Sequence, residues 1–260
     1  MLIHALADSH ELAVVDGDGT LRRLPAVGYP RFPTACAGYG LAYVAIAAAA
    51  SPWQVVIAIT DEKFDILDIL PGAAVFAPPV WSADGAKLLF VRGDSAAAEA
   101  VVWHREDGRT SGVFDAEGLR SATWDGDGRI VYSLGGSVYR KDDPGSPGIP
   151  IIPAAGGLLE FGSDDLYATV DQLCIGVSGT VAGVERWYRQ GLAPSERIVV
   201  VDGTDYVRGP EGRYPQWRGG DRLFYTSTTG IPRSLVGADE PAAGPQAHSV
   251  CWSPEPELQQ

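Results

Sequence analysis

Four ionisable side chains occupy one shared position of a repeated motif, although they lie far apart in the sequence. They are Arg120, Asp165, Arg213 and His248, each four residues before the residue that ends the first strand of a repeat. If the repeats surround one axis, equivalent positions form a ring, so these side chains should meet at one end of that axis. Arginine binds planar oxyanions through paired hydrogen bonds, and a histidine beside a carboxylate can transfer protons.

Two further side chains would extend this ring. Arg31 follows Pro30, which has the same motif position in another repeat, and Tyr214 follows Arg213. With Arg120 and Arg213, they predict a binding site for a small ligand that carries a carboxylate or phosphate group. The alternative interpretation is that these side chains are solvated strand ends without a ligand.

The repeated motif is clearest at residues 79–91, where Pro-Val-Trp-Ser-Ala-Asp-Gly is followed, after one alanine, by Lys-Leu-Leu-Phe-Val. Weaker copies begin at Trp124, Trp217 and Trp252. Each copy predicts a strand that ends at the tryptophan, a tight turn rich in Asp and Gly, and a second, apolar strand. We expect the indoles of Trp81, Trp124 and Trp217 to be buried between neighbouring repeats.

The spacing of the motif predicts the architecture. Six anchor residues recur at intervals of about 35 to 50 residues, the range typical of propeller blades: Thr34, Trp81, Trp124, Thr169, Trp217 and Trp252. The sequence therefore predicts an all-β, six-bladed β-propeller with four-stranded antiparallel blades, formed as one domain by residues 1–260. Its closing blade would combine about residues 246–260 with residues 1–26, so strands from both termini would close the ring.

Residues 79–90, with Pro-x-Trp-Ser-x-Asp-Gly followed by Lys-x-x-Phe, resemble the repeat of TolB-like six-bladed β-propellers. The resemblance implies the propeller fold. Such propellers include periplasmic scaffolds, peptidase-associated domains and lyases, so the resemblance leaves the activity open.

Composition limits the classes of partner. The chain has 260 residues with 33 acidic and 20 basic side chains, a formal net charge of −13, which disfavours nucleic acids and anionic membranes. Three cysteines in different repeats indicate reduced thiols. Residues 1–8 lack the cationic and apolar parts of a signal peptide, so we expect a cytoplasmic protein, and a monomer.

Familiar catalytic and cofactor motifs are missing from the sequence. It has no Gly-x-Ser-x-Gly element and no phosphate-binding loop that ends in Lys-Ser or Lys-Thr, and we expect neither a cofactor nor a metal. One question stays open: whether the closing strand brings His248 beside His4, so that the two could share a metal ion.

Two functional hypotheses follow. The first is a binding module whose charged channel mouth takes a small anionic ligand, or a peptide or protein partner. The second is an enzyme, a lyase, cyclase or hydrolase, that uses the same mouth. His248 would then act as general acid or base with Asp165 assisting it, and Arg120 and Arg213 would hold an anionic substrate.

Overall fold

The computed structural model describes a chain of β-strands joined by turns. It covers residues 2–6, 9–16, 18–47, 54–94, 97–143, 145–152, 166–189, 191–203, 205–218, 222–236 and 247–252. These residues form five antiparallel sheets, four of them with four strands and one with six. None of the described residues forms a helix with the length and apolar character needed to cross a membrane.

Each four-stranded sheet is a simple succession of neighbouring strands. The first contains β22 (Ala247–Trp252), β1 (Leu2–Leu6), β2 (Leu12–Val15) and β3 (Leu21–Leu24). The second contains β4 (Tyr29–Cys36), β5 (Gly40–Ala47), β6 (Gln54–Thr60) and β7 (Ile66–Pro71). The third contains β8 (Val80–Trp81), β9 (Lys87–Gly93), β10 (Ala98–His104) and β11 (Thr110–Ala116). The fourth contains β12 (Leu119–Trp124), β13 (Ile130–Leu134), β14 (Ser137–Lys141) and β15 (Ile149–Ile152).

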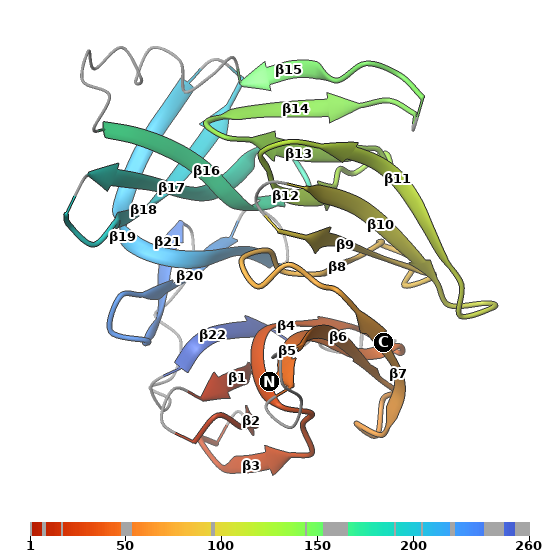
Figure 1. Ribbon diagram of the computed structural model, residues 1–260. Helices are drawn as coiled ribbons and strands as arrows, with labels where there is room; N and C mark the ends of the chain where they lie inside the picture. Colours follow the sequence, from red (N-terminus) through yellow and green to blue (C-terminus); the bar gives the residue numbers. More distant parts are fainter. Residues whose placement is uncertain are drawn as a thin grey trace.

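The sheets are arranged around a central axis, which is viewed nearly end-on in Figure 1. The strands nearest this axis are β4, β8, β12, β22 and, from the six-stranded sheet, β16 (Leu166–Ile175) and β19 (Asp205–Arg218). Neighbouring inner strands contact one another around the axis, including β22 with β4 and β12 with β16. This is the arrangement of a β-propeller.

The prediction of six blades is wrong, because the fourth and fifth predicted units share a strand. The six-stranded sheet runs β16, β17 (Val181–Arg189), β18 (Ser195–Asp202), β19, β20 (Arg222–Ser227) and β21 (Pro232–Val236). The first half of β19 pairs with β18, and its second half pairs with β20. β19 therefore joins two sheets that would otherwise be separate blades, and the described structure has five blades.

The two ends of the chain meet in one sheet. β22 pairs with β1 from Leu2 opposite Trp252 to Leu6 opposite Ala247, as the repeat pattern predicts. All five residues of β1 are buried, and the strand pairs with β22 on one edge and with β2 on the other. Figure 1 shows β22 in blue beside β1 in red.

Apolar side chains fill the spaces between the sheets. Trp81 is 7% exposed and lies edge-on to Trp103, with ring centroids 6.2 Å apart. Trp124 and Trp217 are only half-buried, so the expectation of buried indoles holds fully for Trp81 alone among the three. Buried Tyr43 belongs to the cluster on the other face of the second sheet.

Glycines at the ends of the inner strands fix the true register of the repeats. Gly85, Gly128 and Gly179 all have positive φ and donate to the carbonyl three residues before them. The hairpin of the fourth unit therefore follows Ile175, and the anchor predicted at Thr169 is wrong by six residues. The corresponding turn after β4 begins at Cys36, so the anchor is one residue beyond Thr34.

Candidate functional site

The corrected register changes two positions of the predicted ring, where Arg31 replaces Pro30 and Asp171 replaces Asp165. Counting four residues back from the corrected ends of the inner strands reaches Arg31, Ala77, Arg120, Asp171, Arg213 and His248. Asp171 thus takes the position that we predicted for Asp165, which lies outside the described residues. His248 belongs to β22, but its side chain is not among those described.

The structure brings Arg120 and Arg213 into one ionic network centred on Asp171. Asp171 Oδ2 lies 2.6 Å from Arg186 Nη1 and 3.5 Å from Arg120 Nη2. Glu196 then bonds to Arg186 Nε at 2.6 Å and lies 3.0 Å from Arg213 Nε. The network therefore joins the inner strands β12, β16 and β19 at one end of the axis.

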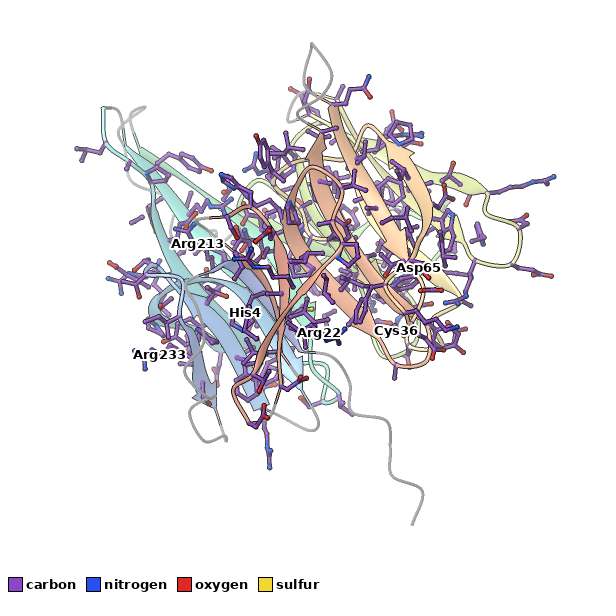
Figure 2. All side chains as sticks on the ribbon, turned by 90° about the horizontal axis from the view of Figure 1, so that it is seen from below. His4, Arg22, Cys36, Asp65, Arg213 and Arg233 are labelled. Atoms are coloured by element: carbon purple, nitrogen blue, oxygen red, sulfur yellow. The ribbon has the colours of Figure 1, made fainter. Side chains whose placement is uncertain are left out.

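Sequence reasoning missed Arg186 and Glu196, because they do not lie on inner strands. They come from β17 and β18, where alternation places them opposite one another in the ladder. Arg186 stands in a run of alternating basic and aromatic residues that gives no sign of a site, and only its ion pair with Asp171 on the neighbouring strand shows its role. Figure 2 shows Arg213 toward the interior, whereas Arg233 of β21 lies near the outer edge.

Burial and charge act in opposite directions on this network. Burial raises the pKa of the Asp171 carboxyl to about 6, although Arg186 and Arg120 both act to lower it. Burial alone would lower the pKa of Arg186, but the carboxylates of Asp171 and Glu196 outweigh it and raise that pKa. The guanidinium of Arg186 is therefore permanently charged, and Asp171 is the member whose charge depends on pH.

Arg31 has the same repeat position as Arg120 and Arg213, but its environment differs from theirs. Its Nη1 donates to the carbonyl oxygen of Pro30 at 2.8 Å, and no carboxylate among the described residues lies within ion-pair distance of it. Partial burial lowers its pKa. Arg31 is thus the cation at this end of the axis whose charge the described residues leave uncompensated.

Tyr214 is close to these charges but packs as a core residue. Its ring meets Phe32 edge-on at a centroid distance of 4.7 Å. Burial raises the pKa of its phenol to about 12, even though Arg213 and Arg186 act to lower it. The phenol is therefore neutral near pH 7 and can serve only as a hydrogen-bonding group.

In three of the inner strands, the next residue forms a bulge. Phe32, Gln172 and Tyr214 have φ of 50°, 53° and 56°, values that residues other than glycine rarely adopt. The ladder register shifts at all three places. The repetition in three inner strands makes the bulge a designed part of the fold.

Side chains at this level bond neighbouring inner strands to one another. Ser249 Oγ accepts from Phe32 N at 2.8 Å, and Gln172 Oε1 accepts from Tyr214 N at 2.9 Å. Ser121 Oγ likewise accepts from Leu173 N at 3.0 Å. We call these three bonds the inner-strand clamps, because each connects an inner strand to the next one around the axis.

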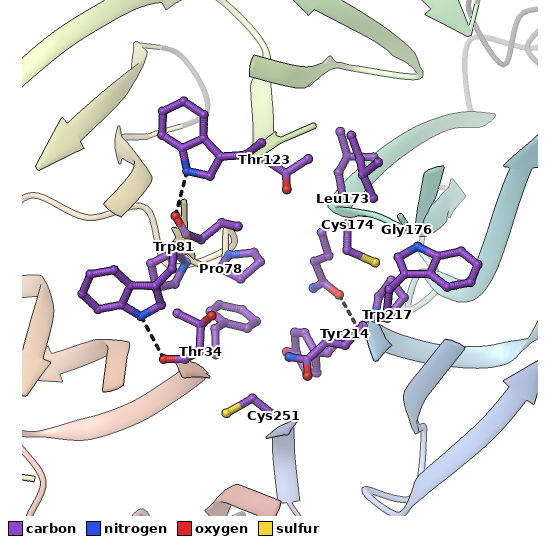
Figure 3. Close-up of a pocket in the computed structure, with 18 of the residues that line it drawn as sticks. Thr34, Pro78, Trp81, Thr123, Leu173, Cys174, Gly176, Tyr214, Trp217 and Cys251 are labelled. Atoms are coloured by element: carbon purple, nitrogen blue, oxygen red, sulfur yellow. Dashed lines mark hydrogen bonds between the residues drawn. The ribbon is translucent and has the colours of Figure 1, made fainter. Parts of the chain in front are cut away.

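A cavity of about 690 Å³ opens below the bulges, toward the hairpin end of the axis. Its walls include Phe32, Trp81, Trp124, Gln172 and Trp217. In Figure 3, Trp81 and Trp217 lie on opposite sides of it, and Cys174 and Cys251 contribute sulfur atoms. Neither Arg31 nor any member of the ionic network lines the cavity, so the axis carries two chemically different regions.

The two cavity thiols have structural partners. The sulfur of Cys174 accepts a bond from the Trp217 backbone, and that of Cys251 accepts one from the Ala35 backbone. Burial raises both thiol pKa values strongly, so the groups stay protonated and weakly nucleophilic. The described residues contain no group of three or more side chains suited to a metal ion. His4 is buried in β1, but a shared site with His248 lies outside the described side chains.

The comparison with known proteins supports the fold. The sequence matches no protein-family model and no curated protein. TolB from Acinetobacter baumannii is similar in structure, with a TM-score of 0.62 at 17% identity over 98% of this chain and 66% of that one. A putative TolB from Agrobacterium tumefaciens gives 0.56 at 14% over 78% and 74%. A putative 6-phosphogluconolactonase from Bacteroides uniformis gives 0.55 at 13% over 96% and 83%.

These identities establish a β-propeller and leave the activity open. The present chain spans 66% of the length of the A. baumannii structure, so functions of that whole protein do not transfer. The resemblance to the TolB-like repeat is thus supported for the propeller fold, but not for the number of blades.

Proposed function

We propose that this chain is a binding module that receives an anionic group at the charged end of its propeller axis. The group would belong to a small molecule, or to a peptide or protein partner. We further propose that it acts as a cytoplasmic monomer and binds neither nucleic acids nor membranes, as its net charge of −13 favours.

One observation carries the proposal: positive charge exceeds negative charge at this end of an acidic protein. The cations are Arg31, Arg120, Arg186 and Arg213, whereas the described carboxylates beside them are Asp171 and Glu196. Arg213 and Arg120 remain 32% and 16% exposed as side chains, so a ligand can reach them. An incoming carboxylate or phosphate would compensate Arg31 and share Arg213 with Glu196.

The enzymatic alternative has less support. It needs His248 as acid or base and Asp165 as its assistant, and neither side chain is described. Tyr214 cannot replace them, because its phenol has a raised pKa of about 12. Asp171 is held by two arginines and is better suited to positioning than to proton transfer.

Isothermal titration with citrate and with inorganic phosphate tests the proposal. Arg31→Gln and Arg213→Gln should each weaken binding by about 1.5 to 3 kcal/mol, the usual value of a charge-assisted hydrogen bond. Arg109→Gln is the matched control, because this exposed arginine lies on a distant hairpin. Equal affinity in all three variants, or no binding of either anion to the unmodified protein, would refute the proposal. A His248→Ala variant that binds normally but loses a measured turnover would favour the enzyme.

A further inference from the structure

Among the described residues, the side-chain amide of Gln172 makes a hydrogen bond through its oxygen and none through its nitrogen. The residue is 1% exposed, and its Oε1 accepts from Tyr214 N at 2.9 Å. Because the backbone N–H can only donate, the amide oxygen must face it, and this fixes Nε2 on the other side. Among the described residues, Nε2 has no hydrogen-bond partner. Buried donors without acceptors are rare in native proteins and call for an explanation.

Gln172 also lines the axial cavity, so its unused donor lies at a space large enough for a ligand. The cavity volume of about 690 Å³ falls within the usual range for small-molecule sites. The backbone of Gln172 has φ 53° because it forms the same bulge as Phe32 and Tyr214, and this bulge holds the residue at the cavity.

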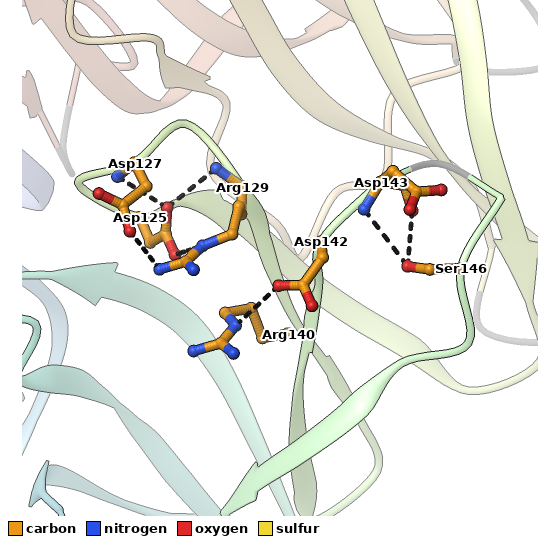
Figure 4. A network of polar contacts seen from close by, with 7 residues as sticks. All are labelled: Asp125, Asp127, Arg129, Arg140, Asp142, Asp143 and Ser146. Carbon is orange, nitrogen blue, oxygen red and sulfur yellow. Dashed lines mark hydrogen bonds and ion pairs between the residues drawn. The ribbon is translucent and has the colours of Figure 1, made fainter.

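The cavity walls define which ligands would be tolerated. No arginine, lysine or histidine is among the described lining residues, which include five aromatic residues and four prolines. The charged residue among them is Asp125, whose carboxylate already accepts from Arg129 Nε and from the backbone N–H groups of Asp127 and Arg129 (Figure 4). An anion would be buried there without a counter-charge, and this is strongly unfavourable.

Indoles supply flat apolar surface on several sides of the cavity. Trp81 and Trp124 are fixed by bonds from Nε1 to the carbonyls of Thr34 and Val80, which Figure 3 marks as dashed lines. The indole of Trp217 packs on the backbone of Gly176, where an added Cβ would lie 3.1 Å from the ring. The cavity walls are therefore held in place and suit a cyclic apolar group of a ligand.

We propose that this cavity binds a neutral cyclic compound through one carbonyl oxygen, which accepts from Gln172 Nε2. The apolar part of the ligand packs between the indoles. This site lies apart from the charged end of the axis and takes the opposite ligand class, so each proposal can fail without the other.

Three probes of matched shape test the proposal: 1-tetralone, tetralin and 1,2,3,4-tetrahydro-2-naphthoate. The ketone has a neutral acceptor, the hydrocarbon has none, and the carboxylate has a charge. The ketone should bind about 2- to 12-fold more tightly than the hydrocarbon, the factor that corresponds to one net hydrogen bond. It should also shift the Gln172 side-chain amide resonances in ¹H–¹⁵N NMR spectra.

Two variants separate the effect of the cavity donor from the effect of the inner-strand clamp. Gln172→Met removes the donor and the clamp together, and Ser121→Ala removes an equivalent clamp from a residue that does not line the cavity. The preference for ketone over hydrocarbon should vanish in the first variant and persist in the second. If Gln172→Met fails to fold, the ketone and hydrocarbon affinities of the unmodified protein still decide the matter.

Several results would overturn the inference. Equal affinity for ketone and hydrocarbon would mean that water alone satisfies Nε2. Tighter binding of the carboxylate would contradict the neutral class, and no binding of the ketone at millimolar concentration would contradict the site. An extended peptide that shifted the Gln172 resonances while the ketone did not would assign the cavity to a different ligand class and would likewise refute the proposal.

Discussion

The indole Nε1 of Trp124 donates a hydrogen bond of 3.2 Å to the backbone carbonyl oxygen of Val80. Trp81 makes the same bond, at 3.3 Å, to Thr34. In both cases the acceptor lies one residue before the anchor residue of the preceding repeat, which is Trp81 in the first case and Ala35 in the second. The tryptophan of the motif thus fixes its sheet against the preceding sheet, and this explains why it recurs in this position.

Replacement of Trp81 by alanine should cost about 3 to 5 kcal/mol in the free energy of unfolding, the usual loss for a large core aromatic. Trp81 is 7% exposed and packs against Trp103. The half-buried Trp124 offers a comparison in which the same replacement should cost less. Urea denaturation followed by circular dichroism measures both, and equal costs would contradict the assigned packing.

Removal of an inner-strand clamp should lower the free energy of unfolding more than removal of a surface hydroxyl does. Ser249→Ala leaves the N–H of Phe32 buried without an acceptor, a loss of about 1 to 3 kcal/mol. Ser111→Ala is the control, since its hydroxyl bonds to His104 at the exposed surface. A destabilisation by Ser249→Ala no larger than that of the control would show that water replaces the clamp.

The closing sheet predicts a sharp effect of truncation. Deletion of residues 246–260 removes β22 and exposes the edge of β1, whose five residues are all buried in the intact protein. An open apolar edge promotes association between molecules, so this variant should aggregate in size-exclusion chromatography. Deletion of residues 253–260 keeps β22 and is the matched control. A monomeric variant of unchanged thermal stability after the longer deletion would be inconsistent with the closure.

The pKa of Asp171, raised by burial to about 6, makes stability depend on pH. The folded state holds this proton more firmly than the unfolded state, where the pKa is near its ordinary value. The stabilising contribution is therefore complete below about pH 4 and is lost as the pH rises through about 6. The unfolding free energy of the unmodified protein, relative to Asp171→Asn, should increase as the pH falls from 7 to 4. The exposed Asp115→Asn is the control, and a difference that does not vary with pH would contradict the assignment.

The sequence predicted the propeller and its closure well, because tryptophans and Asp-Gly turns mark the inner hairpins at Trp81 and Trp124. It misplaced the fourth repeat, where Ile175 replaces the tryptophan and Gly176 replaces the aspartate of the turn. A β-branched residue at a strand end gives no signal that distinguishes it from its neighbours. The error moved the predicted carboxylate from Asp171 to Asp165.

The shared strand could not be predicted for a different reason. The region before Arg213 contains Gly209 and Pro210, which interrupt its apolar pattern and give no sign of a continuous strand. The structure accommodates them inside β19, because the register shifts between Arg197 and Val199 on one edge and between Arg213 and Gln216 on the other. Only the pairing partners on both edges reveal that this segment is continuous.

The antiparallel pairing of β1 with β22 places Leu2 opposite Trp252. If the protein were held at these two residues and pulled, the backbone hydrogen bonds between β1 and β22 would carry the load one at a time and not all together. The ring should therefore open under a small force at its closing sheet. The continuous strand β19 would still hold the two parts of the six-stranded sheet together. A single-molecule stretching trace would then begin with a weak event that releases β22, followed by stronger events from the remaining sheets.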